Sequence, residues 1–588
     1  MMFGTNKQFS LERLPFSAPN AFLSIYQDVN DKNMYLSLCR GNLPHVDRPS
    51  LMKITPVIEG EEVPFTYTCT PSRLTIKTKT GTIEFAYQTA QVIRVRVNGV
   101  AVRISYSPRI HEAGCVHADG VIEIGFSRIG KLSFVPISGR TENDVQWNFS
   151  KVCPSPYNID LLPAKDGKAG EIAIHEYTSN TLPCKVYPSF DEVAGCMSEA
   201  FRRFGENYAE VPAVYKDMGE KAKYMVWHSQ LGPYGTLKDT MIYMHKLFIN
   251  RAYGWQQCFH AMAMEKNVRE AWRLLNVFFD YQNECGGVPD SISDLSQISW
   301  ATTKPPLFGY AVCYILDNFG TSDLRSNDFA SLFTKLAAYT KWWFTHRDHS
   351  GTGVPAYYHP DESGYDEATL FNEGLPIVAP DLQAYIVMCC EACSRLAELS
   401  GFESEAETWR AESKRVLDYL VDTLWDGEQF LAYLPAKKMM YKCGSLAQLQ
   451  PIMLGSRLPQ EIIDILAKRI FDSEEFLTAY GLASENLKSE KLVMRSYTRG
   501  AVISPTQMLI INGLYDAGRK ESAQMLAIRY LNALTHMGLA LGIHSYRIEP
   551  VLGNIIAAEQ TGLAVGYPFS SWVGSIFLSL SGRILKDF

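Results

Sequence analysis

The chain has 588 residues, more than one hydrophobic core usually supports, so we expect at least two domains. It is 46% apolar and 20% charged, which is typical of a folded protein and excludes intrinsic disorder. The formal net charge is −7 and no long run of lysine or arginine occurs, so the sequence predicts no nucleic-acid partner.

Targeting and redox signals are few. The N-terminus lacks the basic start and apolar run of a secretory signal, and no apolar stretch is long enough to cross a membrane. The 13 cysteines are scattered, so we expect reduced thiols. The sequence therefore predicts a cytoplasmic protein with no membrane partner, no metal site and no cofactor, and it leaves the oligomeric state open.

The first two hundred residues alternate apolar and polar side chains, which is the period of a strand. Residues 73–87 turn at Thr80-Gly81, residues 92–106 turn at Asn98-Gly99, and residues 116–126 turn at Asp119-Gly120. Each pattern predicts a β-hairpin. Several such strands at close spacing predict an antiparallel β-sandwich over residues 1–205, including a linker.

From about residue 215 the apolar period changes to that of a helix. Residues 328–347 place apolar side chains on one face, and residues 381–401 and 403–427 predict an αα-hairpin that turns after Gly401. Further helical runs begin near residues 221, 255, 269, 305, 448, 459, 505, 521 and 571. About twelve helices in six hairpins predict an (α/α)6 toroid over residues 206–588, with an open helical solenoid as the alternative.

One loop of the helical half is unusually acidic. The stretch HPDESGYDEATLF, residues 359–371, holds four carboxylates within seven residues and no lysine or arginine: Asp361, Glu362, Asp366 and Glu367. A solvated acidic loop is the ordinary explanation. Other long loops between the helices also carry acids, cations and rings, and a toroid gathers such loops at one end. That combination favours a sugar-binding site.

Six segments, in order, resemble the (α/α)6 catalytic domain of glycoside hydrolase family 63, which is related to the family 37 trehalases. They are GWQQCFHAMAM (254–264), TKPPLFGYA (303–311), RDHSGTGVPAYYHPDESGYDEA (347–368), PDLQAYI (380–386), RSYTRGAV (495–502) and FSSW (569–572). The Glu-Ser-Gly-x-Asp segment is the most specific of them. A β-rich front domain also fits such proteins.

The resemblance implies the catalytic residues. It makes Asp366 the general acid, and it implies a second carboxylate that activates water from the opposite face of the sugar. We choose Glu549, which precedes Trp572 by 23 residues, as that base, with Glu559 as the alternative. The expected substrate-binding residues are Trp255, Gln256, Trp300, Lys304, Glu362, Tyr365, Arg499 and Trp572.

The chain departs from the family at three places. Gln256 stands where the family has an aspartate that grips the innermost sugar, and the segment before Arg499 lacks a tryptophan. The segment that holds Glu549 also lacks the Lys-Tyr that follows the base in trehalases. These departures leave the identity of the sugar open and argue against a trehalase.

We therefore predict an inverting exo-glycosidase that acts on a small α-linked glucoside or a related α-linked disaccharide. An α-L-rhamnosidase-like hydrolase and a disaccharide phosphorylase of the same architecture are the enzymatic alternatives. A sugar-binding protein without catalysis is the alternative from another class.

Overall fold

The computed structural model describes residues 9–12, 14–28, 30–40, 51–126, 130–179, 185–247, 249–295, 298–493, 496–536, 546–549, 554–557 and 570–586. The chain divides into two compact units, which we describe separately. The first contains residues 1–205, 224–251 and 293–296, and the second contains residues 206–223, 252–292 and 297–588. The domain boundary at 205/206 stays a prediction.

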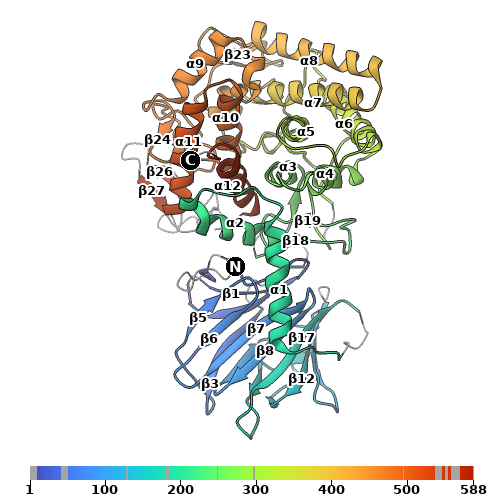
Figure 1. Ribbon diagram of the computed structural model, residues 1–588, viewed down its shortest axis with the longest axis vertical. Helices are drawn as coiled ribbons and strands as arrows, with labels where there is room; N and C mark the ends of the chain where they lie inside the picture. Colours follow the sequence, from blue (N-terminus) through green and yellow to red (C-terminus); the bar gives the residue numbers. More distant parts are fainter. Residues whose placement is uncertain are drawn as a thin grey trace. The chain divides into compact units, whose positions relative to one another are not determined.

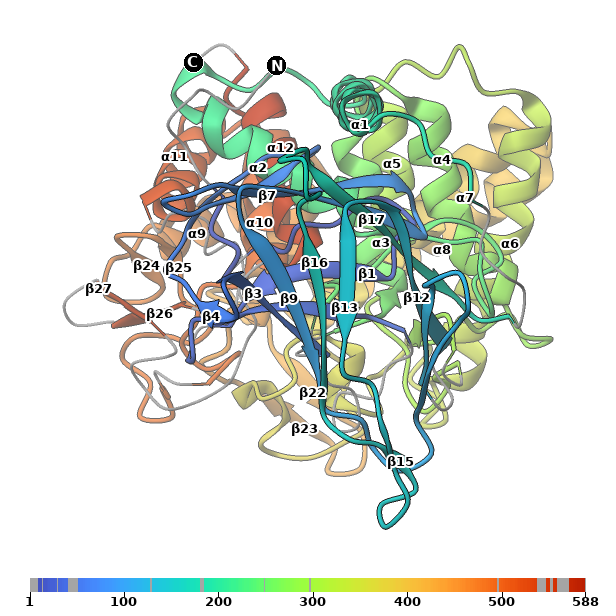
Figure 2. The same cartoon turned by 90° about the horizontal axis from the view of Figure 1, so that it is seen from below.

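The first unit contains two antiparallel sheets, whose strands alternate buried and accessible residues. One has the order β1–β2–β3–β9–β16–β13, with β4 paired to β3, and Figure 2 shows its part from β3 through β9 and β16 to β13. Its strands are β1 Leu23–Gln27, β2 Met34–Leu38, β3 Met52–Ile58, β4 Glu61–Glu62, β9 Ala101–Tyr106, β13 Arg140–Asn143 and β16 Tyr157–Leu162. The other has the order β10–β11–β12–β17–β8–β7–β6–β5; its strands are β5 Thr66–Cys69, β6 Leu74–Lys77, β7 Thr82–Thr89, β8 Val92–Asn98, β10 Ala113–Val116, β11 Ile122–Phe126, β12 Gly130–Ser138 and β17 Gly170–Tyr177.

Two of the three predicted hairpins are confirmed, and one is wrong. Strands β6 and β7 pair across Thr80-Gly81, and β10 and β11 pair across Asp119-Gly120. At Asn98-Gly99 the chain does turn, but β8 and β9 belong to different sheets. The physical reason is that β8 is already paired on both sides, with β7 and β17. The strand that follows this turn therefore pairs elsewhere, with β3 and β16.

Buried charges hold the later segments of the first unit in place. The guanidinium of Arg40 donates to the carboxylate of Glu176 and lies 3.6 Å from that of Asp294, in the segment 293–296. The same guanidinium lies over the rings of Phe22 and Tyr234, at 3.8 Å and 4.2 Å from their centroids. These three acid and base side chains are almost fully buried, so each charge needs the others to offset its desolvation.

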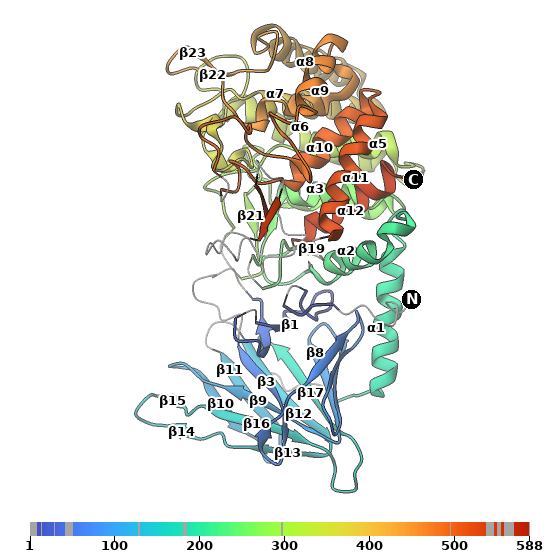
Figure 3. The ribbon, with the colours of Figure 1, turned by 90° about the vertical axis from the view of Figure 1, so that its left-hand side faces the viewer.

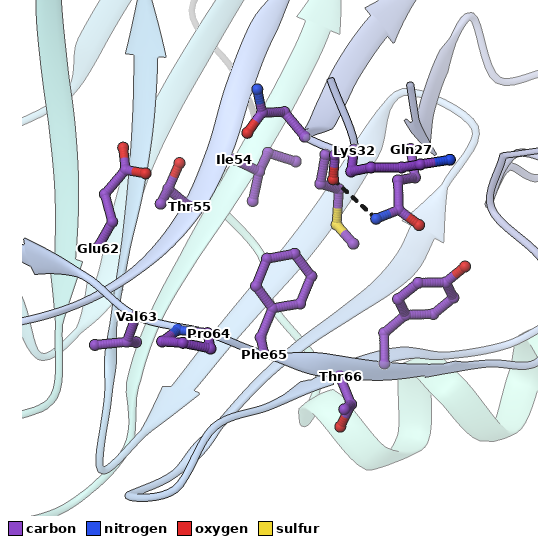
Figure 4. Close-up of a pocket in the computed structure, with 12 residues that line it drawn as sticks. Gln27, Lys32, Ile54, Thr55, Glu62, Val63, Pro64, Phe65 and Thr66 are labelled. Carbon is purple, nitrogen blue, oxygen red and sulfur yellow. Dashed lines mark hydrogen bonds between the residues drawn. The ribbon is translucent and has the colours of Figure 1, made fainter. Parts of the chain in front are cut away.

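A hollow of about 630 Å³ lies on the first unit beside β3 (Figure 4). Phe65 projects toward Ile54, and the two charged residues of the lining are engaged elsewhere: Lys32 pairs with Glu12 and Glu62 with Lys53. The remaining elements of this unit are α1 Phe190–Gly205, which packs on β7, and the paired short strands β14 Trp147–Asn148 with β15 Cys153–Pro154 and β18 Gln230–Leu231 with β19 Met241–Ile242.

The second unit is helical (Figure 1). Its helices are α3 Gly254–Ala263, α4 Val268–Asn276, α5 Phe308–Asn318, α6 Ser326–His346, α7 Pro380–Leu399, α8 Glu403–Thr423, α9 Gln460–Ile470, α10 Ser504–Asp516, α11 Lys520–His536 and α12 Ser571–Arg583, and α2 Lys216–His228 begins in this unit and ends in the first. The 3₁₀ helices are η1 Ala213–Tyr215, η2 Val277–Tyr281, η3 Pro360–Glu362, η4 Thr369–Phe371, η5 Leu446–Gln448 and η6 Gln450–Arg457. Short strand pairs join β20 Ala252–Tyr253 to β21 Ser291–Ile292, β22 Ala432–Leu434 to β23 Met439–Tyr441, β24 Leu477–Thr478 to β25 Gly481–Leu482, and β26 Tyr546–Glu549 to β27 Asn554–Ala557.

Six of these elements form a closed inner ring. Each contacts the next in the order α3, α5, α7, η6, α10, α12, and α12 contacts α3 again. The outer helices α4, α8, α9 and α11 each pack on the ring element that precedes or follows them in the chain. Every residue of α3 is buried, as are nearly all of α10 and α12. The predicted fold class, an antiparallel β-sandwich followed by an (α/α)6 toroid, is confirmed.

Glycine lets the ring elements approach closely. A Cβ atom added at Gly309 of α5 would collide with the backbone of Cys389 in α7, and one at Gly513 of α10 would collide with the carbonyl of Ile452 in η6. The ring element η6 is a 3₁₀ helix broken at Gly455 (φ +58°), where the sequence predicted an α-helix beginning near residue 448. In the part of the chain that the structure describes, no helix combines the length and apolarity needed to cross a bilayer.

Candidate active site

The acidic loop rests on the first turn of the innermost helix. Gly364, with φ +72°, lies against the indole of Trp255 in α3, and a Cβ atom at this position would come within 2.6 Å of the ring. Only glycine combines this left-handed backbone with so close a contact. The Ser-Gly-Tyr turn of the loop is therefore seated on a tryptophan of the toroid's core.

Glu362 holds the loop from within. Its side chain is almost fully buried, and one oxygen accepts from Nη2 and Nε of Arg347 at 2.7 Å and 3.1 Å. The other oxygen accepts from the backbone N–H of Tyr358 at 2.8 Å. With both oxygens engaged and the charge balanced, this carboxylate fixes the loop's shape. We therefore assign Glu362 a role in shaping the loop. Its predicted contact with a sugar stays a prediction.

Tyr365 belongs to a buried hydrogen-bonded chain that joins three ring elements. Its hydroxyl donates to Oε1 of Gln450 in η6 at 2.5 Å and accepts from the hydroxyl of Thr506 in α10 at 3.1 Å. The amide of Gln450 donates in turn to the hydroxyl of Tyr385 in α7 at 2.6 Å. The residue next to Asp366 is thus fixed to the core of the toroid.

Asp366 has the properties of a general acid. The residue is exposed on one side, yet desolvation by the surrounding protein raises the pKa of its carboxyl group to about 6. The positive charge of Lys304 lowers this pKa, and the nearby carboxylates of Asp361 and Glu367 raise it. A carboxyl with a pKa close to neutral can hold a proton and release it to a substrate at physiological pH.

Lys304 faces Asp366 from another loop. Its ammonium pairs with Oδ1 of Asp290 at 3.0 Å, donates to the backbone carbonyl of Asp361 at 3.3 Å, and lies 5.6 Å from the ring centroid of Tyr253. Burial alone would lower the pKa of Lys304, but the carboxylates of Asp290 and Asp366 outweigh that effect and raise it. Lys304 therefore stays charged beside the proposed acid.

Arg499 and its neighbours close the far side of the loop. The guanidinium of Arg499 donates to the backbone carbonyl of Glu367 and to Oδ1 of Asn372, the second at 2.8 Å. The hydroxyl of Thr498 accepts from the backbone N–H of Glu367 at 2.8 Å. Thr498 and Arg499 thus contact the segment that holds Asp366.

Trp255, Gln256 and Trp572 lie together at the start of α3 and α12. The two indoles meet edge to face with centroids 5.0 Å apart. The amide nitrogen of Gln256 donates to the hydroxyl of Ser571 at 2.9 Å, and its Oε1 atom is buried without a hydrogen-bond partner among the described residues. An unpaired buried carbonyl is costly, so this atom suits a ligand hydroxyl.

The structure describes the remaining predicted site residues less completely. Trp300 is 45% exposed. Glu549 is the last residue of β26, opposite Asn554 of β27, and its side chain lies outside the described residues. Glu559 also lies outside them. The assignment of the base therefore stays a prediction.

Sequence reasoning gave no role to two acids. Asp290 is the ion-pair partner of Lys304. Asp381 follows a proline at the start of α7, where an acid ordinarily stabilises the helix dipole. It is instead fully buried and accepts from the hydroxyl of Tyr357 at 2.9 Å, and burial raises its pKa to about 7.

A protein-family model matches about half of the chain. Residues 250–546 match the model described as "Mannosylglycerate hydrolase MGH1-like glycoside hydrolase domain". This segment includes the acidic loop, Lys304, Arg499 and α3.

Curated relatives are similar over a shorter stretch. A mannosylglycerate hydrolase from Selaginella moellendorffii, MGH2, is 26% identical over 147 residues, which is 22% of this chain and 30% of that protein. The mannosylglycerate hydrolase of Thermus thermophilus is 27% identical over 141 residues, 21% of this chain and 34% of that protein. The chain thus matches about a third of the length of these relatives.

Solved structures share the fold. A GH63 mannosylglycerate hydrolase from Thermus thermophilus, in complex with Tris and D-glycerate, superposes with a TM-score of 0.51 at 18% identity. The alignment covers 61% of this chain and 98% of that one. The same enzyme in complex with glucose gives a TM-score of 0.50 at 19% identity, with the same coverage.

Proposed function

Because the chain belongs to the Mannosylglycerate hydrolase MGH1-like glycoside hydrolase family, we propose that it hydrolyses a small α-linked glycoside with inversion at the anomeric carbon. The resemblance to glycoside hydrolase family 63 is confirmed, and the chain is a glycoside hydrolase whose substrate is a sugar. The identity of that sugar, the stereochemical course and the role of each residue are what we propose here.

Asp366 is the general acid, because its loop is fixed to the inner ring by the contact of Gly364 with Trp255 and by the hydrogen bonds of Tyr365; a pKa of about 6 fits that role. In its protonated form the carboxyl donates to the glycosidic oxygen as the bond to the anomeric carbon breaks. The turn at Gly364 on Trp255 and the hydrogen bonds of Tyr365 hold the acid in one position. A fixed acid avoids the entropic cost of orienting it in the transition state.

Glu549 is the general base, with Glu559 as its alternative. In an inverting hydrolase the base removes a proton from water as that water attacks the anomeric carbon from the opposite face. The two carboxyl groups are then roughly 6.5–9.5 Å apart, which leaves room for the water. Mutation of each glutamate separately decides between the two.

Lys304, Arg499 and Gln256 provide polar contacts to the sugar. Lys304 is a charged donor beside Asp366, and Gln256 has an unpaired carbonyl oxygen that accepts from a sugar hydroxyl. Trp255 and Trp572 form the apolar wall next to Gln256. Both charged residues keep protein partners, so they orient the loop as well as the ligand.

The substrate class is a small α-glycoside. Relatives that carry the name mannosylglycerate hydrolase make mannosylglycerate the first compound to test. An α-linked glucoside or disaccharide is the second, and it is the class that the sequence alone indicated. The side chain of Gln256 is uncharged, so its hydrogen bonds to a sugar hydroxyl are weaker than those that an aspartate at this position would make.

Proton NMR of the anomeric signals tests the proposal. The purified protein is incubated, with and without phosphate, with mannosylglycerate, α-glucosides, trehalose, α-mannosides and α-rhamnosides. We expect the β-anomer of the released sugar to appear first, without phosphate. Asp366→Asn and either Glu549→Gln or Glu559→Gln should slow turnover by about 10²–10⁴-fold, the usual contribution of an acid or base.

The alternatives give different results. First appearance of the α-anomer would exclude inversion, and dependence on phosphate would indicate a phosphorylase. The matched control is Asp361→Asn, a second carboxyl of the same loop that we place outside the chemistry. Loss of activity in that variant equal to the loss in Asp366→Asn would remove the special role of Asp366.

A further inference from the structure

Outside the catalytic unit, the hairpin β10–β11 brings together three side chains that bind metals. They are Cys115, His117 and Glu123, on the predicted hairpin at residues 116–126 and the residue just before it. One atom of each, the thiol sulfur, a ring nitrogen and a carboxylate oxygen, lies within 4.8 Å of the other two. Nothing in the proposed reaction uses them.

The sheet register explains why they meet. Cys115 of β10 pairs directly with Glu123 of β11, so both side chains project from the same face. His117 lies two residues beyond Cys115, which places it on that face as well. Ile122 and Ile124, the neighbours of Glu123, are buried on the opposite face, so Glu123 points toward solvent. Three donors of different types thus share one accessible face.

The hairpin lies at an edge of the eight-stranded sheet, where β10 pairs only with β11 in the order of that sheet (Figure 3). An edge position leaves room for an ion and for water. The backbone N–H of His117 donates to the carbonyl of Val121 at 2.8 Å and holds the end of the hairpin closed. The two strands therefore present the ligands on a paired backbone rather than on separate loops.

We propose that Cys115, His117 and Glu123 bind one zinc ion, with water as its fourth ligand. Zinc accepts sulfur, imidazole nitrogen and carboxylate oxygen together in a tetrahedral site. The bond lengths of zinc put neighbouring ligand atoms roughly 3.3–3.7 Å apart. Side-chain rotations that move these atoms by about an ångström therefore complete the site. A thiolate and an imidazole favour zinc over calcium or magnesium, which prefer oxygen ligands.

Lys131 competes with the ion. Its ammonium pairs with one oxygen of Glu123 at 2.8 Å, and the hydroxyl of Tyr177 donates to the other at 3.0 Å. Zinc binding must share or displace the lysine, which lowers the affinity. A cation so placed also keeps the carboxylate ordered when zinc is absent. This competition makes a specific prediction, because removal of the lysine charge should strengthen zinc binding.

Isothermal titration of the full chain with zinc, and absorption spectroscopy with cobalt(II), test the proposal. We expect one zinc ion per chain at this site and a thiolate-to-cobalt charge-transfer band. Cys115→Ser and His117→Asn should weaken zinc binding by at least about tenfold, and Cys115→Ser should abolish the band. Lys131→Met should strengthen zinc binding several-fold. All three side chains are accessible, so circular dichroism should show folded variants.

The matched control is Cys196→Ser, which removes another exposed cysteine of the same unit, on α1, and should leave binding and the band unchanged. Three results would overturn the proposal. They are no zinc binding at micromolar concentrations, unchanged binding in both Cys115→Ser and His117→Asn, or weaker binding in Lys131→Met. None of these measurements depends on glycosidase activity.

Discussion

Opposing charges act on Asp366 at the scale of single residues. Burial raises its pKa, Lys304 lowers it, and Asp361 and Glu367 raise it, with a resulting value of about 6. Lys304 also pairs with Asp290 at 3.0 Å, so its charge interacts with two carboxylates.

Two substitutions should move this pKa in opposite directions. Lys304→Met removes a positive charge that favours the carboxylate, so the pKa of Asp366 should rise. Asp361→Asn removes a negative charge that disfavours the carboxylate, so the pKa should fall. Because the acid works in its protonated form, the alkaline limb of kcat/KM against pH reports this pKa, which is about 6 in the unmodified chain.

The limb should shift to higher pH in Lys304→Met and to lower pH in Asp361→Asn. Lys414→Met is the control and should leave the limb where it is, because Lys414 is an exposed lysine of the outer helix α8 that pairs with Asp418. Shifts of both loop variants in the same direction would contradict the charge assignment around Asp366.

At the scale of elements, the loop at residues 359–371 is ordered by contacts of three kinds. Glu362 binds Arg347, which precedes the loop, Gly364 rests on α3, and Tyr365 reaches η6 and α10. Each contact joins the loop to a residue outside it, so the loop takes its shape from the assembled toroid rather than from its own sequence.

Gly364→Ala should therefore lower kcat much more than it changes the fold. The added Cβ would come within 2.6 Å of Trp255 at a φ of +72°, and the loop must move away from α3 to relieve the contact. A displacement of about 1 Å at a positioning site can reduce the rate by roughly 10²-fold.

Gly374→Ala is the matched control for backbone strain. Gly374 also has a positive φ, +115°, but nothing lies within 4 Å of a Cβ added there. Its variant should lose stability yet keep most of its kcat. Similar kcat values in the two variants would show that the contact with Trp255 does not position the acid.

Local sequence patterns predicted helices and tight turns correctly where residues close in the chain determine the structure. The helical period at residues 328–347 corresponds to α6, and the Asp119-Gly120 turn joins β10 to β11. The Asn98-Gly99 turn failed as a hairpin because the partners of β8 are set by the whole sheet.

The acid of the loop could be predicted from its composition and the family resemblance, but the residues that hold the loop could not. Arg347 lies 15 residues along the chain from Glu362, and Gln450 lies 85 residues from Tyr365. Asp290, the partner of Lys304, comes from a separate loop. No local pattern encodes such pairs, because the assembled toroid brings them together.

At the scale of the whole molecule, the closed ring of α3, α5, α7, η6, α10 and α12 buries polar groups that must find partners inside it. Asp381 is a fully buried acid whose hydrogen bonds are only partly satisfied. One of its oxygens accepts from Tyr357, and the other has no partner among the described residues. Burial raises the pKa of its carboxyl to about 7, so the neutral form predominates below that pH.

This pKa predicts how stability depends on pH. The folded pKa of about 7 lies above the ordinary value of 3.8, so the folded state holds a proton that the unfolded state has lost between these values. Stability from this group is therefore greatest at low pH, falls as pH rises through the interval, and levels off above pH 7. Asp381→Asn keeps the shape and removes the titration.

Relative to the unmodified chain, the Asn variant should gain free energy of unfolding as pH rises from 5 to 8, on the order of 3 kcal/mol at most. Urea unfolding followed by circular dichroism at the two pH values measures the difference. A variant that is equally stabilised or destabilised at both would contradict the burial of an ionisable Asp381.

The measurement that tests the account most directly compares leaving groups in Asp366→Asn. A general acid is needed when the departing oxygen is a poor leaving group, and it is dispensable when a dinitrophenolate departs. On a methyl or glycerate glycoside of the sugar that the chain accepts, we predict a loss of kcat of about 10²–10⁴-fold. On the dinitrophenyl glycoside of that sugar the loss should be far smaller. An equal loss on both substrates would show that Asp366 does not protonate the leaving group and would contradict the account.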